Sequence, residues 1–268
     1  MLFAYLLTAL LIELPDSNSL IESKSLAKGL DLITIHQNAS ASKCDITILR
    51  IDPKYYDLVC AGINLNPHDT LKSAKDWCRS KNFIAAINAG MFATDYISHT
   101  GYLKYNGVIY SKRQTKYQSV LAFKPNGQSH PLPFRIYDLD EQGVNIEFLS
   151  GAYSSVIQNL RLIKRPGVNV WGQSYRVWSE AAIGEDNQGR ILFIYSNNPV
   201  SMHDLNDELL RSNIGIVAAQ HLEGGPLAQL YIHIGTLELS LGGGTDNQMQ
   251  GSAENPMPVP NVIGIKAK

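Results

Sequence analysis

The sequence predicts an α+β fold: a single strand-rich domain with a mixed, largely antiparallel sheet and a few flanking helices. Short apolar or alternating runs recur along the chain, and turns rich in Gly, Pro and Asn separate them, which is typical of strands. Few stretches carry apolar residues at helical spacing. The 268 residues contain no repeat and no low-complexity tract, and this length can bury one sizeable core. We therefore expect a leader over residues 1–25 and one domain over residues 26–268.

The overall charge limits the classes of partner that the protein can bind. The formal net charge is -1, whereas a nucleic-acid binder needs a basic face for phosphates. We therefore expect no nucleic-acid partner.

The first fourteen residues form an apolar run that only Glu13 interrupts. The run is too short for a membrane span and is typical of the apolar core of a secretory signal. No Lys or Arg precedes it and no clear cleavage site follows, so a buried N-terminal helix is the alternative. We expect export to the periplasm or the exterior, with no membrane span left once the leader is removed.

The three cysteines, Cys44, Cys60 and Cys78, all lie in the first third of the chain. Cys44 and Cys60 flank a predicted hairpin and are the best candidates for a disulfide in an exported protein. Three free thiols are the alternative. No pair has the close spacing of a zinc or redox site.

The first half of the chain is mostly strands. We predict strands over residues 30–35, 45–51 and 56–61, and a buried strand over residues 83–87. A helix is expected over residues 67–81, capped by Asp69 or Thr70. Asn106-Gly107 is a favoured two-residue hairpin turn. Residues 130–143 are rich in Pro and Asp and are expected to be irregular.

The second half has clearer patterns. Residues 181–184 and 190–195 form a predicted hairpin. Ser201 and Asp204 have the spacing of a capping box and begin a helix. Residues 258–265 form the last predicted strand.

The stretch from residue 220 to 232 is the most informative. An apolar run over residues 214–219 leads into a polar break, residues 220–226, and an alternating strand, residues 227–234, follows. In the break, Glu223 precedes Gly224 and Gly225, which places a carboxylate against bare backbone at a strand end. A tight turn without function is the alternative.

Polar residues at strand ends are the candidate site residues, because packing holds the strand and leaves its end free to meet a ligand. Glu180 stands just before a predicted strand. The candidates for substrate binding are Asn88, Gly90, His99, Gln158, Asn159, His221, Gly224 and Gly225. Structural roles are the alternative for each: Asn88 can cap a turn, and a histidine is often a satisfied core residue.

Several well-known site motifs are missing from the sequence. The histidines lack zinc spacing, the serines lack a nucleophile elbow, and no phosphate loop or dinucleotide fingerprint is present. We expect no metal and no cofactor.

Several sequence blocks, in order, resemble the phosphodiester glycosidase family. INAGMF (87–92) resembles the Asn-Gly-Gly-Phe-Phe block of that family, and HLEGGPLA (221–228) resembles its Asn-Leu-Asp-Gly-Gly-Gly-Ser block. The other similar blocks are GYLKYNG (101–107), SGAYSSVIQNLRLI (150–163), AAIGEDNQGRILFIYS (181–196) and VPNVIGI (259–265). The resemblance covers residues 30–268. It implies a hydrolase that cleaves a glycosidic bond in a sugar-1-phosphodiester or a related cell-envelope glycan, with carbohydrate as its partner.

The sequence departs from this family at the site itself. Glu180 stands where the family usually has Arg, Glu223 where it has Asp, and His221 where it has Asn. Losing the Arg removes a phosphate clamp, which makes an alcohol leaving group comparatively more plausible.

Glu223 and Glu180 are the expected catalytic pair, since glycoside hydrolysis commonly uses two carboxylates. A non-catalytic envelope glycan-binding protein is the alternative. Carboxyl groups that face one cleft about 5–10 Å apart fit the enzyme, and carboxyl groups on different surfaces fit the binder. Metal-assisted hydrolysis through His221 and Glu223 would need a third ligand that the sequence does not identify.

Overall fold

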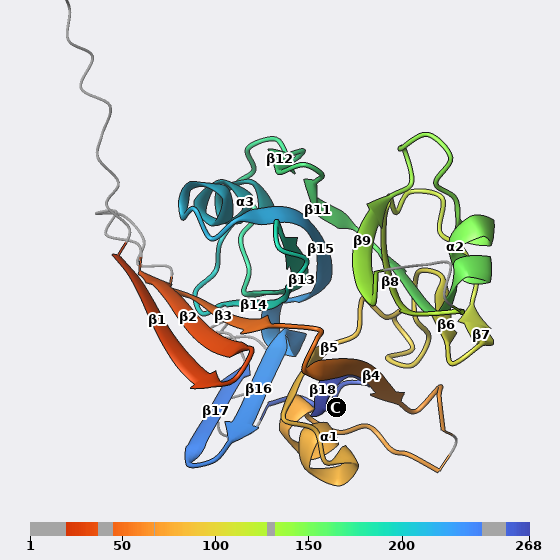
Figure 1. The fold of residues 1–268 in the computed structure, drawn as a ribbon, viewed down its shortest axis with the longest axis horizontal. Helices are drawn as coiled ribbons and strands as arrows, with labels where there is room; N and C mark the ends of the chain where they lie inside the picture. Colours follow the sequence, from red (N-terminus) through yellow and green to blue (C-terminus); the bar gives the residue numbers. More distant parts are fainter. Residues whose placement is uncertain (1–19, 37–44, 67, 128–131, 243–255) are drawn as a thin grey trace, which may run out of the picture.

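The computed structural model describes residues 20–36, 45–66, 68–127, 132–242 and 256–268. In this part of the chain, 50% of the residues are in strands and 13% in helices, and every strand pair is antiparallel. The prediction of a strand-rich α+β fold is confirmed. The strands form one sheet of eight and two sheets of five (Figure 1).

The eight-stranded sheet carries the site described below. Its strands, in spatial order, are β1 (Leu20–Ala27), β2 (Leu30–His36), β3 (Asp45–Ile51), β14 (Ile191–Ser196), β13 (Glu180–Asp186), β15 (Ile216–Gly224), β11 (Arg161–Lys164) and β12 (Val168–Asn169). Helix α3 (Met202–Arg211) packs on one face through Leu205 and Leu209. Its N-cap, Ser201, accepts from the backbone N–H of Asp204 at 3.1 Å, as the capping-box spacing predicts.

The two smaller sheets complete the fold. One has the order β7 (Val108–Ser111), β6 (Leu103–Tyr105), β10 (Tyr153–Asn159), β8 (Ser119–Pro125) and β9 (Phe134–Asp138), with α2 (Ile146–Ala152) beside it. The other has the order β17 (Leu237–Gly242), β16 (Gln229–Ile234), β5 (Ala85–Asn88), β18 (Asn261–Ala267) and β4 (Tyr56–Gly62), with α1 (Ala74–Lys81) packed on it. One apolar core contains buried residues from all three sheets, such as Phe193, Leu121 and Ile263, so the sheets fold as one unit.

Several boundaries differ from the prediction. Helix α1 starts at Ala74, because Ser73 caps it, while the expected cap Asp69 pairs with Lys72 and Lys81. The segment expected to be irregular contains β9. Strand β1 covers Leu20–Ala27, and the leader expected over residues 1–25 stays a prediction.

Strand β15 also differs, because it continues through the predicted polar break to Gly224. Its polar residues find partners inside the fold: Gln220 accepts a hydrogen bond from Ser119 at 3.1 Å, and His221 pairs with Glu180. Buried polar groups with partners are compatible with a central strand.

Two further sequence predictions concern the cysteines and the N-terminal apolar run. Cys60 and Cys78 are free, and burial raises the pKa of each thiol to about 12. Cys44 and the apolar run over residues 1–14 lie outside the described residues. None of the helices that the structure describes has the length and hydropathy needed to cross a bilayer.

Gly101→Ala is expected to lower stability by about 2–3 kcal/mol, within the range for overpacking a well-packed site. A Cβ at this position would lie 2.1 Å from the backbone oxygen of Gln158, so the neighbouring strand must move. Thermal unfolding followed by circular dichroism should show a melting temperature lower by several degrees. Gly151→Ala is the control, because a Cβ there meets nothing within 4 Å. A Gly101→Ala protein that melts like the wild type would contradict the packing described.

Candidate active site

The pairing of β13 with β15 brings three ionisable side chains together. Glu180 lies on β13, and His221 and Glu223 lie on β15, at least 41 residues further along the chain. Ala181 pairs with Glu223 and Ala182 with His221, so Leu222 is an extra residue at a β-bulge. Leu222 is fully buried in the central core. His221 and Glu223 flank it, and both line a cavity.

Glu180 lies behind His221 and is 1% exposed. Its Oε1 is hydrogen-bonded to Nδ1 of His221, and its Oε2 accepts from Nε1 of Trp178 at 2.8 Å. Both oxygens are therefore engaged, and Glu180 is not among the residues that line the cavity. A carboxylate in this arrangement orients the imidazole and favours its charged form.

His221 is a buried histidine with a raised pKa. Burial alone would lower the pKa, but the charge of Glu180, the hydrogen bond that Nδ1 donates to Glu180 and the charge of Glu223 together raise it above the ordinary value. No described residue makes a hydrogen bond to Nε2, so this nitrogen is available to a ligand in the cavity.

Glu223 has a pKa of about 7. Burial is the main cause, and the nearby charge of Glu180 adds to it, while His221 and the backbone N–H of Gly224 act in the opposite direction. That N–H donates to Oε1 of Glu223 at 3.0 Å. A carboxyl group with a pKa near 7 can both give and accept a proton at neutral pH, as a general acid or base must.

The cavity in front of these groups has a volume of about 680 Å³. This lies within the range of about 300–1,000 Å³ that is usual for small-molecule sites. The lining residues are Met91, Leu160, Trp171, Gly172, Ser174, Arg176, Trp178, Met202, His203, His221, Glu223 and Gly224. Aromatic walls with a few polar groups are typical of a site that binds an organic ligand.

Two of the residues that were expected to bind substrate form hydrogen bonds with backbone atoms instead. Asn88 donates to the backbone oxygen of Leu227 at 3.0 Å and accepts from the N–H of Gln229 at 2.7 Å. Gln158 uses both amide atoms on the backbone of Tyr102, Gln114 and Tyr117. Neither lines the cavity.

Gly90, His99 and Asn159 pack against one another beside the cavity. Gly90 has φ +144°, and a Cβ there would lie 2.5 Å from Oδ1 of Asn159 and 2.6 Å from Cε1 of His99. Burial lowers the pKa of His99 to about 4, so this histidine is neutral at neutral pH. These residues support Met91 and Leu160, which follow Gly90 and Asn159 in the sequence and line the cavity.

Of the expected site residues, the structure groups Glu180, His221, Glu223 and Gly224, while Gly225 turns away and donates to the oxygen of Ser179 at 2.8 Å. Sequence reasoning missed a further part of the cavity wall, which residues 169–178 contribute and which we name the rim segment. Two of the three tryptophans in the chain lie in this segment, which was the available signal.

In the described part of the chain, no three His, Cys, Asp or Glu side chains are grouped as metal ligands. A third ligand beside His221 and Glu223 is therefore not identified there.

The family comparison gives one clear match. A family model described as phosphodiester glycosidase matches residues 81–266. No curated protein matches the sequence.

Solved structures share the fold at low sequence identity. One is a hypothetical protein from Synechocystis, with a TM-score of 0.60, 16% identity, and coverage of 92% of this chain and 64% of that chain. Another is the catalytic domain of zebrafish N-acetylglucosamine-1-phosphodiester alpha-N-acetylglucosaminidase, auto-inhibited by its pro-peptide, with a TM-score of 0.60, 13% identity, and coverage of 93% and 84%. A third comes from Burkholderia pseudomallei, with a TM-score of 0.54, 10% identity, and coverage of 85% and 75%. This chain thus spans less than two thirds of the Synechocystis protein.

Proposed function

The chain belongs to the phosphodiester glycosidase family, and from this we propose that it is a hydrolase that cleaves the glycosidic bond of a sugar-1-phosphodiester or a related cell-envelope glycan. The observation that carries the proposal is Glu223, a largely buried carboxyl group with a pKa of about 7 that lines the cavity beside His221. Such a group is poised for proton transfer at neutral pH.

We assign Glu223 as the catalytic acid. With an alcohol leaving group, the protonated carboxyl gives its proton to the glycosidic oxygen as the bond from that oxygen to the sugar carbon breaks. Water then supplies the hydroxyl group to the sugar carbon, and its remaining proton returns to the carboxylate. A phosphodiester leaving group is already a weak base, so it needs less proton transfer and more stabilisation of negative charge.

His221 supplies that stabilisation. Its imidazolium, favoured by Glu180, offers an N–H and a positive charge inside the cavity. The imidazolium is hydrogen-bonded to Glu180, and Glu180 is the residue that stands in the sequence where the family usually has arginine. Glu180 was expected to be the second catalytic carboxylate, and we propose that it acts through His221 as a positioning residue.

A glycan-binding protein without catalysis is the second candidate. It is favoured by one observation: only Glu223 of the two carboxyl groups lines the cavity, whereas a pair of catalytic carboxylates would both face it. We further propose a carbohydrate partner and export from the cytoplasm, the latter supported by the apolar run over residues 1–14.

An assay for released sugar separates the two candidates. The full chain should be incubated with a panel of sugar-1-phosphodiesters and glycosides, and free sugar should be measured over time. We expect release from at least one member, and a loss of that release in Glu223→Gln. Tight binding of panel members without any release would favour the glycan-binding protein and overturn the hydrolase.

A further inference from the structure

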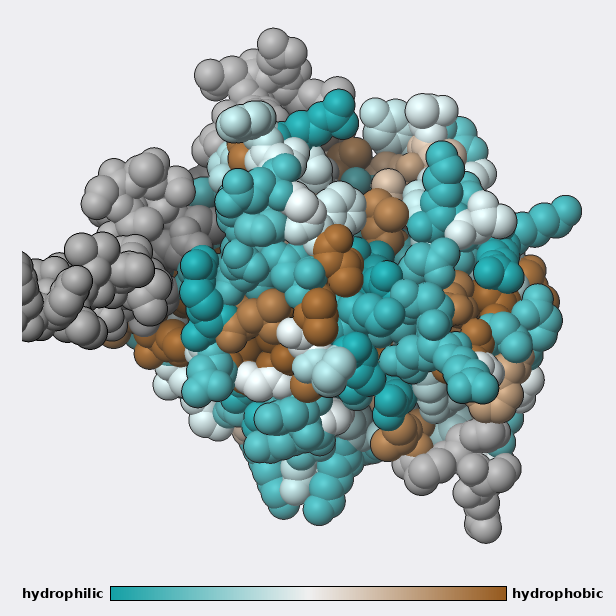
Figure 2. Space-filling view, turned by 90° about the horizontal axis from the view of Figure 1, so that it is seen from above, coloured by the Kyte–Doolittle hydropathy of each residue, from teal (hydrophilic) through white to brown (hydrophobic). Residues whose placement is uncertain are grey.

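The rim segment presents hydrophobic and cationic side chains at the cavity. Val170, Tyr175 and Val177 are exposed, and Trp171 and Arg176 line the cavity. Figure 2 shows hydrophobic patches among hydrophilic residues on the face seen from above, and β12 lies in the upper part of Figure 1.

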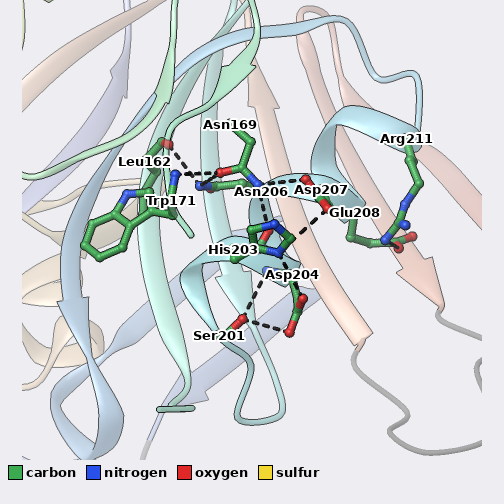
Figure 3. Close-up of polar contacts among 10 residues, drawn as sticks. All are labelled: Leu162, Asn169, Trp171, Ser201, His203, Asp204, Asn206, Asp207, Glu208 and Arg211. Carbon is green, nitrogen blue, oxygen red and sulfur yellow. Dashed lines mark hydrogen bonds and ion pairs between the residues drawn. The ribbon is translucent and has the colours of Figure 1, made fainter. Parts of the chain in front are cut away.

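A polar network attaches the start of the rim segment to α3 (Figure 3). Asn169 donates to Oδ1 of Asp207 at 2.7 Å and to the backbone oxygen of His203 at 3.0 Å. Asn206, which is fully buried, donates to Oδ1 of Asn169 at 3.0 Å and to the backbone oxygen of Leu162 at 2.9 Å. Asn169 is thus tied both to the helix and, through Asn206, to β11.

The same network positions Trp171. Its backbone N–H donates to Oδ1 of Asn169 at 3.1 Å, and its Nε1 donates to the backbone oxygen of Arg161 at 2.7 Å (the first of these is drawn in Figure 3). The indole is therefore held at both ends while its ring lines the cavity. A fixed, half-buried aromatic ring is a suitable surface for the apolar face of a sugar, because little side-chain freedom is lost on binding.

Arg176 is the residue of the cavity wall whose side chain is positively charged at all ordinary pH values. No carboxylate of the described residues forms an ion pair with its guanidinium, and Glu223 is the one carboxyl group among the lining residues. An unpaired guanidinium at a cavity mouth attracts an anionic group and can bind its oxygens in a bidentate manner.

We propose that Trp171 and Arg176 form a binding subsite in which the indole stacks on a sugar ring and the guanidinium binds a negatively charged group, so that this chain selects anionic sugars. The inference rests on the proposed function in taking the cavity as the substrate site. It makes Arg176 a specificity-determining residue for this cavity.

Binding, measured by titration calorimetry, tests this subsite without requiring turnover. The probes are hexose 1-phosphates and the matching free hexoses: glucose, galactose, mannose and N-acetylglucosamine. We expect the wild-type chain to bind at least one hexose 1-phosphate about ten-fold or more tightly than its free hexose, with a preference that weakens as salt is added. A wild-type protein without such a preference overturns the proposal.

Arg176→Gln should remove most of the preference for the phosphate, and Arg176→Lys should keep part of it, because lysine retains the charge but not the planar fork. Tyr175→Ser is the matched control: Tyr175 is the neighbouring residue, is fully exposed and does not line the cavity. If Tyr175→Ser loses as much preference as Arg176→Gln, or if Arg176→Gln keeps it, the subsite is wrong.

Trp171→Leu tests the stacking surface, since leucine keeps apolar bulk but has no flat face. We expect weaker binding of the phosphorylated and free sugars alike, with an unchanged ratio between them. A changed ratio with unchanged binding of the free sugar would contradict the stacking role.

Activity distinguishes this inference from the proposed function. If the protein releases no sugar but Arg176→Gln loses its phosphate preference, the subsite stands and the hydrolase fails. If sugar is released while Arg176→Gln shows wild-type binding and KM, the hydrolase stands and the subsite fails.

Discussion

Glu223→Gln is expected to lower turnover by about 10²–10⁴-fold, the usual contribution of a general acid, and to stabilise the folded protein at neutral and alkaline pH. The two effects share one cause. Burial raises the pKa of Glu223 from 4.5 to about 7, so the carboxylate form is disfavoured in the folded state. Glutamine removes both the titrating proton and the cost of a buried charge.

The sign of the stability change follows from proton binding. Between pH 4.5 and about 7 the unfolded chain loses the Glu223 proton while the folded chain keeps it, so the free energy of unfolding falls with rising pH. Above about pH 7 both states are ionised and the loss is complete. The advantage of Glu223→Gln should therefore grow from pH 4.5 to 7 and level off at about 3–4 kcal/mol, taking about 1.4 kcal/mol for each pKa unit.

Melting temperatures of both proteins from pH 4 to 9, together with kcat at each pH, check this expectation. Glu147→Gln is the control, because it makes the same change at an exposed position on α2. A Glu223→Gln protein that is less stable than the wild type at pH 8, or that keeps kcat within two-fold, would contradict the role of Glu223.

Glu180→Gln is expected to reduce kcat by about 10–100-fold, the range for partners that hold a functional side chain in place. The amide keeps the shape of the carboxylate but not its charge. Burial then dominates at His221, and its pKa falls. The decline of activity on the alkaline side should therefore move to lower pH.

The pH dependence of stability is a second test of the Glu180–His221 pair. Because the folded-state pKa of His221 is raised, the pair stabilises the fold fully below the ordinary histidine value of 6.5 and loses this contribution as pH rises through the folded-state pKa. The stability difference between the wild type and Glu180→Gln should thus be largest below pH 6.5 and narrow above it.

Glu185→Gln separates positioning from general structural damage. Glu185 is also a buried carboxyl group on β13, but it pairs with Arg165 at 2.6 Å and does not line the cavity. This variant breaks the ion pair with Arg165 and should leave the pH dependence of kcat unchanged. A Glu180→Gln protein that shows the same unchanged pH dependence would reduce Glu180 to a structural residue.

Local patterns predicted many elements correctly. The Asn106-Gly107 turn joins β6 and β7, with φ values of +48° and +86° that suit this residue pair, and Ser201 caps α3. Both features depend on residues within four positions of one another. Strands β9 and β12 and the start of α1 were not predicted. Each of the two strands pairs with the strand that precedes it in the chain, but neither has a clear alternating pattern, and Ser73 rather than Asp69 caps α1.

The sequence predicted only part of the residues that line the candidate site. Glu223, His221 and Gly224 stand at a strand end that the Gly-Gly pair marks, and they line the cavity. The rim segment has no periodic pattern, and its place at the cavity depends on contacts with α3, more than thirty positions away in the chain.

The sequence by itself determined the strand-rich fold class, the family, and the carboxylate beside two glycines, because these depend on residue order and short-range pattern. Only the tertiary structure decided that Glu180 lies behind His221 and that Glu223 has a pKa near 7. The pairing of β13 with β15 and the hydrogen bond from Trp178 to Glu180 join segments whose contact the sequence pattern does not indicate. Charge interactions and desolvation act through space between residues far apart in the chain, and periodicity along the chain carries no information about them.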